Sequence, residues 1–324
     1  MNTRRKLVFA LGTGVFAAPR IVFAQVTPPA VRRIGILTPV DLATYPVFVE
    51  ALQRLGYEDG KNVRLLLRAA KLDYTRLPAL ARELVDEKVE LIVAINTPGV
   101  HAAIDATKTI PIVMTQVGDP VGSGFVTNLA RPGGQVTGLS NMVADLGGKR
   151  LSILQELVPA AKRIAVLYNP VDPVNLPQIR DVKAVAAKLG VEVRLYPLKT
   201  PDDLPETFKT LLAWRAQGVI WLQGQQAQFQ SGTIALAAKH KLPVMVGSPL
   251  DVVAGGLVAY GADSAEIFKR TAAYVDKILK GAKAGDLPVE QPTHFDLTIN
   301  LKTARALGLK IPQSILIQAT KVIE

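Results

Sequence analysis

Short runs of aliphatic and β-branched residues alternate with amphipathic segments along this chain, and this alternation constrains its fold most. The run at 91–95, Leu-Ile-Val-Ala-Ile, is apolar throughout, as expected for a strand covered on both faces. Within 77–87, Leu77, Leu80 and Leu84 recur at helical spacing. Strands that alternate with helices form parallel βαβ units with right-handed crossovers. The sequence therefore predicts the α/β class, with helices on both faces of parallel sheets.

The alternation runs through two series, which the glycine-rich segment 131–148 separates. Two series in a chain of this length predict two doubly wound, Rossmann-like lobes. We expect an N-terminal lobe at 31–140 and a C-terminal lobe at 141–261. The predicted strands are 33–37, 63–67, 91–95 and 110–115 in the first series, and 163–168, 191–196, 218–222 and 242–246 in the second.

The chain continues beyond the second series with an amphipathic helix, a strand and two further apolar segments, at 265–279, 295–299, 301–307 and 315–317. If this tail returns to the first lobe and then to the second, the chain crosses between the lobes several times and forms a hinge. We expect residues from about 262 to 297 to complete the N-terminal lobe. Residues from about 298 to 324 are expected to complete the C-terminal lobe.

The first twenty-four residues have the layout of a secretory signal peptide. Arg4, Arg5 and Lys6 precede an apolar run at 7–18, and Val22-Phe23-Ala24 offers a cleavage pattern before Gln25. We expect cleavage after Ala24 and a periplasmic mature protein. A buried N-terminal helix is the alternative interpretation. Because 3–8 is close to a twin-arginine pattern, both the twin-arginine and the general-secretory route stay open.

Composition narrows the function classes. The chain has no cysteine, so an exported form must be stabilised by its core alone, and a lipid anchor at the cleavage site is not expected. The whole chain carries a formal net charge of +11, of which four cations lie in the first 24 residues. The remaining basic residues are scattered among acidic ones, so nucleic-acid binding is not expected. No second apolar stretch approaches the roughly 18 residues of a transmembrane helix.

Ligands of open parallel sheets bind beyond the carboxyl ends of the strands. Thr97 lies at a helix start, where it can contact an anion or simply cap the helix. Asp263 can neutralise an ammonium group or begin the next helix as a capping box with Glu266. Three aromatic residues near strand ends can enclose an aromatic ring of the ligand or belong to the core: Tyr45, Trp221 and Tyr260. The candidate ligand-binding residues are Thr38, Tyr45, Asn96, Thr97, Thr115, Gln116, Asn169, Trp221, Gln223, Ser248, Tyr260 and Asp263.

Signatures of catalysis are missing from the sequence. It has neither a phosphate-binding Gly-x-x-x-x-Gly-Lys-Ser/Thr loop nor a Gly-x-Ser-x-Gly nucleophile motif. Gly118, Gly122 and Gly124 do not form a dinucleotide fingerprint, and the three histidines are too far apart in sequence for metal-ligand spacing. We therefore expect no catalytic residue, no metal and no cofactor.

Two long blocks carry a resemblance to a known family. Residues 111–122, Pro-Ile-Val-Met-Thr-Gln-Val-Gly-Asp-Pro-Val-Gly, and 129–139, Leu-Ala-Arg-Pro-Gly-Gly-Gln-Val-Thr-Gly-Leu, resemble the ABC-transporter substrate-binding proteins that include tryptophan-binding and other aromatic amino-acid-binding members. The similarity extends over 33–324. Further similar blocks are 33–37, 55–57, 287–293, 299–304, 306–308 and 311–312.

The resemblance implies a type I periplasmic-binding-protein fold, in which three crossings join two α/β lobes that close on a ligand. It places the ligand-contact loops at Thr38, Asn96-Thr97, Thr115-Gln116 and Asp263. It also implies a small-molecule solute and an inner-membrane ABC permease as partners of a monomer. The segments 221–230 and 247–249 are expected to shape the pocket for the ligand's side chain.

Three functions remain in competition at this point. The first is an exported receptor of an ABC importer that binds a small solute, with an apolar or aromatic amino acid as the expected ligand. The second is a ligand-binding sensor component for a membrane receptor. The third is an exported hydrolase or epimerase, which the missing nucleophile, metal and dinucleotide motifs disfavour.

Overall fold

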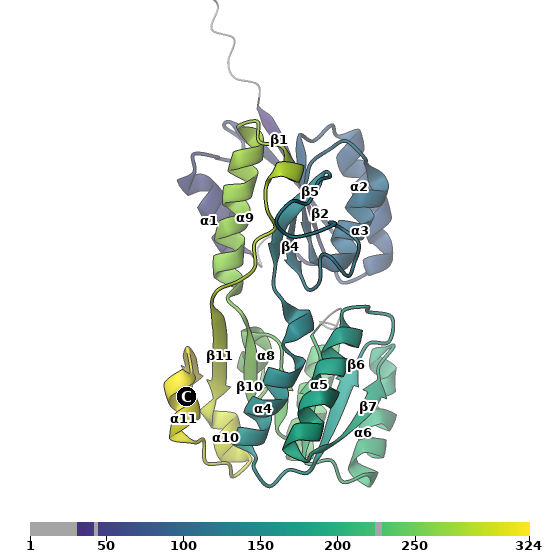
Figure 1. Ribbon diagram of the computed structural model, residues 1–324, viewed down its shortest axis with the longest axis vertical. Helices are drawn as coiled ribbons and strands as arrows, with labels where there is room; N and C mark the ends of the chain where they lie inside the picture. Colours follow the sequence, from purple (N-terminus) through teal and green to yellow (C-terminus); the bar gives the residue numbers. More distant parts are fainter. Residues whose placement is uncertain (1–30, 42–44, 224–228) are drawn as a thin grey trace, which may run out of the picture. The chain divides into compact units, whose positions relative to one another are not determined.

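The computed structural model describes residues 31–41, 45–223 and 229–324. The predicted signal peptide and its cleavage site lie outside these residues. Residues 31–324 form one compact unit that contains two β-sheets with their helices (Figure 1). Among the described residues, no helix is both long and apolar enough to cross a membrane.

The N-terminal sheet has five parallel strands in the order β2-β1-β3-β4-β5. Side chains of β3 alternate between two hydrophobic clusters: Ile92 and Ala94 pack with α2 and α3, whereas Leu91 and Val93 pack with α1 and α9. Burial on both faces explains the continuous apolar run. The strands are β1 (Arg32–Thr38), β2 (Val63–Ala69), β3 (Leu91–Ile95), β4 (Ile112–Val117) and β5 (Val136–Ser140). The helices are α1 (Pro46–Arg54), α2 (Leu77–Asp86), α3 (Asn96–Ala106) and α9 (Ser264–Leu279), with the 3₁₀ turns η2 (Tyr74–Arg76) and η6 (Ala284–Asp286).

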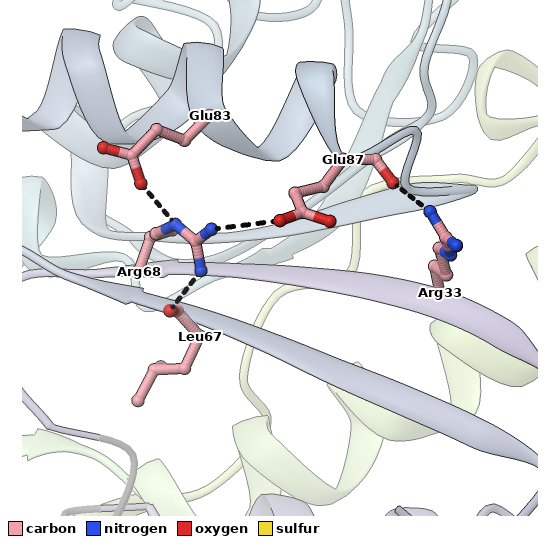
Figure 2. A network of polar contacts seen from close by, with 5 residues as sticks. All are labelled: Arg33, Leu67, Arg68, Glu83 and Glu87. Carbon is pink, nitrogen blue, oxygen red and sulfur yellow. Dashed lines mark hydrogen bonds and ion pairs between the residues drawn. The ribbon is translucent and has the colours of Figure 1, made fainter. Parts of the chain in front are cut away.

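Surface polar contacts tie α2 to the first two strands (Figure 2). Arg68 donates to Glu83 at 2.6 Å and lies 3.8 Å from Glu87. Arg33 in turn donates to the carbonyl oxygen of Glu87 at 2.8 Å. Because the glutamates are exposed and Arg68 is only half-buried, each pair contributes about 1 kcal/mol or less.

The second sheet has seven strands in the order β12-β11-β10-β9-β8-β6-β7. Among the described strands of this sheet, β10 and β11 form the one antiparallel pair, and β12 runs parallel to β11. The sheet is therefore mixed, whereas the strand–helix alternation predicts parallel strands. Its strands are β6 (Arg163–Tyr168), β7 (Glu192–Pro197), β8 (Gly218–Trp221), β9 (Val244–Val246), β10 (Val258–Ala262), β11 (Phe295–Asn300) and β12 (Lys321–Ile323). Its helices are α4 (Gly147–Leu157), α5 (Asn175–Leu189), α6 (Leu204–Ala213), α7 (Gln230–Lys239), α8 (Pro249–Val253), α10 (Leu301–Ala306) and α11 (Gln313–Gln318), with η3 (Val143–Asp145) and η4 (Pro201–Asp203).

The chain passes between the two sheets three times. It leaves the first sheet after β5, returns after β10 to form α9 against α1 and β4, and enters the second sheet again at β11 (Figure 1). The antiparallel direction of β11 follows from this return, because the strand enters at the sheet end where β10 leaves. The expected two-lobe α/β fold is confirmed. The lobe boundaries expected from the sequence stay predictions, since 31–324 form one unit.

The glycine-rich segment 131–148 contains a strand that the sequence pattern did not reveal. Within it, β5 pairs with β4 as the edge of the first sheet. Gly138 adopts φ +132°, and a Cβ there would lie 2.0 Å from the carbonyl oxygen of Met114. Glycine therefore lets the two backbones approach closely, although its presence weakens the strand signal in the sequence.

Candidate functional site

A cavity of about 460 Å³ opens where the strands of both sheets end. The first turns of α1, α3 and α9 contribute to its lining, together with loops that follow β4, β6, β8 and β9. Its volume is within the usual range of small-molecule sites, roughly 300–1,000 Å³. The position agrees with the general location of ligands in open α/β sheets.

The structure brings six of the twelve predicted site residues together around this cavity. These are Tyr45, Asn96, Thr97, Gln116, Gln223 and Ser248. They come from both sheets, and each lies in or beside a loop that follows a strand.

The other six predicted residues lie outside the lining of this cavity. Thr38 and Thr115 are fully buried at the ends of β1 and β4, and Thr115 accepts a hydrogen bond from Thr271 at 2.9 Å. Asn169 is buried and accepts from the backbone N–H of Val171 at 3.1 Å.

Two predicted aromatic residues pack within the second sheet. Trp221 is 4% exposed in a core cluster, and its indole N–H has no hydrogen-bond partner among the described residues. Tyr260 stacks on Phe295 with ring centroids 5.8 Å apart. Neither ring lines the cavity.

Asp263 caps helix α9. Its carboxylate accepts from the backbone N–H groups of Ala265 at 2.8 Å and Glu266 at 3.2 Å. It lines a separate cavity of about 300 Å³, beside the ion pair of Arg270 and Glu290. The geometry favours the helix-cap interpretation of this residue.

The start of α3 gives the cavity a set of backbone hydrogen-bond donors. No side chain caps this 11-residue helix. The helix therefore supplies no partner for the N–H groups of Asn96, Thr97 and Gly99, and its dipole makes this end favourable for negative charge. Asn96 adopts φ +68°, a left-handed conformation that Asn tolerates better than most residues.

Gln116 adds a side-chain donor from the end of β4. A bulge places Thr115 and Gln116 opposite the single residue Leu139 of β5, and Gln116 adopts φ +57°. Its Oε1 accepts from the Nδ2 of Asn141 at 3.2 Å, whereas its buried Nε2 has no partner among the described residues. A buried amide donor without a partner is costly, so this group favours an acceptor on a ligand.

Asp172 is the one charged side chain among the described residues that line the cavity. It lies in the loop between β6 and α5, is 4% exposed, and accepts from the backbone N–H of Val174 at 3.1 Å. The pKa of the neighbouring Tyr74 is raised to about 12, mainly by burial. The charges of Tyr45 and Asp172 raise it further. A buried carboxylate in a ligand cavity is suited to an ammonium group.

The candidates named from sequence omitted Asp172. The available signal was a carboxylate three residues after Asn169, in a loop that follows a buried strand. Asp263 had the same kind of signal, and only the tertiary structure separates the two positions.

Two aromatic side chains form an apolar wall of the cavity. The rings of Tyr45 and Phe268 lie 4.6 Å apart between centroids, and Phe48 supports Phe268 from behind at 6.4 Å. Burial raises the pKa of the Tyr45 hydroxyl, which also hydrogen-bonds to Thr38. This wall can pack against an apolar or aromatic group of a ligand.

The described residues contain no group of three or more His, Cys, Asp or Glu that could hold a metal ion. The lining combines one anion with several donors and an apolar wall. This arrangement is suited to holding a small zwitterion with an apolar part.

The chain resembles proteins of known structure and function over most of its length. It is 31% identical to the tyrosine-binding protein of Clostridioides difficile over 265 residues, which is 81% of this chain and 76% of that protein. A conserved domain protein of Vibrio cholerae has 31% identity and a TM-score of 0.84, and the match covers 90% of this chain and 99% of that one. The ABC domain of Streptococcus pneumoniae in complex with L-Trp has 26% identity and a TM-score of 0.83, and the match covers 91% and 100%.

The family model of ABC transporter substrate-binding proteins matches residues 33–323. This confirms the resemblance inferred from residues 111–122 and 129–139. The chain therefore belongs to the family of ABC transporter substrate-binding proteins.

Proposed function

We propose that this protein is an exported receptor that binds an α-amino acid with an apolar or aromatic side chain and delivers it to an inner-membrane ABC permease. Asp172 carries the proposal, because it is the single charged side chain among the described residues of the cavity lining. Relatives named for tyrosine and solved with L-Trp support the same ligand class.

Each part of such a ligand has a matching group in the cavity. The ammonium group pairs with the Asp172 carboxylate. The α-carboxylate accepts from backbone N–H groups at the start of α3, for which the helix supplies no partner, and from Nε2 of Gln116. The side chain packs against Tyr45 and Phe268.

A binding titration with L-tyrosine, L-tryptophan and L-phenylalanine tests this assignment. The variant Asp172→Asn keeps the side-chain acceptor for Val174 but removes the charge. Affinity for the amino acid is expected to fall by roughly 1.5–3 kcal/mol, the scale of a charge-assisted hydrogen bond. Asp263→Asn is the matched control, since it removes a carboxylate that caps a helix outside this cavity.

Ligand analogues sharpen the test. A des-amino analogue such as 3-(4-hydroxyphenyl)propionate lacks the ammonium group, so Asp172→Asn should not weaken its binding. Loss of affinity in Asp263→Asn with none in Asp172→Asn would move the ammonium site to the other carboxylate. Absence of binding of all three amino acids to the wild type would refute the ligand class.

We further propose that export removes residues 1–24 and leaves Gln25 as the first residue of a periplasmic protein. The charged start, the apolar run and the Val-Phe-Ala cleavage pattern support this. N-terminal sequencing of protein recovered from the periplasm should give Gln25, and recovery of the intact leader would contradict the proposal. Replacing both Arg4 and Arg5 with Lys should block export only if the route is the twin-arginine one.

A further inference from the structure

Arg150 is a fully buried cation, and its guanidinium makes three hydrogen bonds, to β10, to α5 and to the loop after β8. It lies in α4, and burial lowers its pKa to about 10. Nε donates to the carbonyl oxygen of Tyr260 at 2.9 Å, Nη1 to Oε1 of Gln178 at 3.1 Å, and Nη2 to Oε1 of Gln223 at 2.7 Å. Among the described residues, no carboxylate lies within 4.0 Å of it. The three hydrogen bonds thus go to neutral acceptors, while the charge of Asp251 acts on the guanidinium from farther away and favours its charged form, which is costly to bury.

One of these acceptors belongs to the cavity lining. Gln223 follows β8, and its carbonyl oxygen accepts from Nε2 of Gln178 at 2.8 Å and from Nδ2 of Asn175 at 3.1 Å. Its side chain lies against Gly247, where an added Cβ would come within 2.8 Å of three of its carbon atoms. Both the backbone and the side chain of Gln223 are thus held in one position.

The contact with Arg150 also fixes which end of the Gln223 amide is presented to the cavity. A guanidinium has only donors, so the atom that faces it must be the amide oxygen. The amide NH₂ is then turned away from Arg150, on a residue that belongs to the cavity lining. Gln116 in the first sheet is held in a similar way: Asn141 donates to its amide oxygen, and its buried Nε2 has no partner among the described residues.

We infer that Arg150 is a positioning residue for ligand binding: it locks Gln223 so that Nε2 donates to the carboxylate of the bound amino acid. The backbone places this donor near the ammonium site, because Asn175 links Gln223 to Asp172 by donating its own N–H to the Asp172 carbonyl at 3.1 Å. This proximity suits an α-amino acid, whose carboxylate and ammonium groups are both attached to the α-carbon. The inference rests on the proposed function and adds an amide donor from the second sheet to those of α3 and Gln116.

The variant Gln223→Glu separates binding from folding. A carboxylate at this position pairs directly with Arg150, so the melting temperature should be kept or raised. The donor is lost and a negative charge faces the ligand carboxylate, so affinity for L-tyrosine or L-tryptophan should fall about tenfold or more. Affinity equal to that of the wild type would overturn the inference.

A double-mutant cycle then tests the positioning role of Arg150. Arg150→Met should weaken amino-acid binding about tenfold when Gln223 is present, because the amide is no longer held. In a Gln223→Leu background there is no amide to orient, so Arg150→Met should lower the melting temperature without further loss of affinity. If the affinity loss of the double variant equals the sum of the losses of Arg150→Met and Gln223→Leu, Arg150 acts on the fold alone and the inference is wrong.

The wild type serves as the reference that separates the two proposals. If it binds none of the three aromatic amino acids, the proposed function fails. If it binds one of them and the cycle shows no coupling, only the role of Arg150 fails. If Arg150→Met does not fold, the affinity of Gln223→Glu still decides the role of the Gln223 donor. Arg150→Lys then replaces Arg150→Met in the cycle, because a single ammonium group cannot reproduce the three hydrogen bonds of the guanidinium.

Discussion

Gly138 offers a direct test of how β5 is built into the first sheet. A Cβ at this position would lie 2.0 Å from the carbonyl oxygen and 2.8 Å from the nitrogen of Met114, both backbone atoms. The strand cannot simply move away, because its other edge is held by hydrogen bonds of 2.9 Å between Glu290 and the backbone of Gly138 and Ser140. The substitution Gly138→Ala therefore forces a rearrangement of the edge strand.

The expected cost has two sources. A non-glycine residue at φ +132° costs about 1–3 kcal/mol in backbone strain. Relief of the steric overlap adds about 1–3 kcal/mol. Together these give a loss of about 2–6 kcal/mol, a large part of the roughly 5–15 kcal/mol that stabilises a folded domain.

Two other glycines serve as matched controls that separate backbone strain from steric overlap. An added Cβ at Gly134 meets nothing within 4 Å and φ is not positive there, so Gly134→Ala should change stability by less than about 0.5 kcal/mol. Gly190 has φ +62° with open space around it, so Gly190→Ala should cost only the left-handed backbone term of about 1–2 kcal/mol.

Urea unfolding followed by far-ultraviolet circular dichroism measures the free energy of unfolding of all three variants. The expected order of destabilisation is Gly138→Ala, then Gly190→Ala, then Gly134→Ala. A loss for Gly138→Ala no greater than that for Gly190→Ala would refute the close approach of β5 to β4. The register that places Gln116 at the cavity would then be wrong as well.

Two further predictions concern carboxylates outside the main cavity lining. Burial raises the pKa of Asp251 from 3.8 to about 6, against the hydrogen bonds from Ser248 and Gln230 and the charge of Arg150. The protonated acid is therefore favoured in the folded state, and its contribution is fully present below the unfolded pKa and lost as pH rises through about 6. The wild type should lose about 2.5 kcal/mol relative to Asp251→Asn between about pH 4 and pH 7 in denaturant titrations, and a constant difference would contradict the shift. Asp263→Ala removes the cap of α9 and should lower the free energy of unfolding by about 1 kcal/mol, measured by thermal unfolding. Asp263→Asn should leave this free energy almost unchanged, because Asn caps as well as Asp. Equal losses in the two variants would argue against a capping role.

Local patterns in the sequence were enough to predict the two-lobe α/β class, although not β5 or the antiparallel pairing of β10 with β11. The runs at 91–95 and 164–167 are continuously apolar because both faces of these strands are covered, so the residue types alone indicate this burial. The loops that follow strands are equally readable, since parallel strands bring their carboxyl ends to one edge. For this reason Asn96, Gln116 and Gln223 could be named before their surroundings were known.

Tertiary structure alone decided which polar groups serve the cavity. Asp172 and Asp263 both follow strands, but one lines the cavity and the other caps a helix, and no local pattern encodes that difference. The orientation of Gln116 depends on a bulge against β5, a strand with a weak signal of its own. Arg150 resembles any charged residue of an amphipathic helix, and it is buried only because Tyr260, Gln178 and Gln223 supply acceptors from three other parts of the chain. Propensity and hydrophobic period are properties of neighbouring residues, whereas hydrogen-bond partners are chosen by the assembled fold.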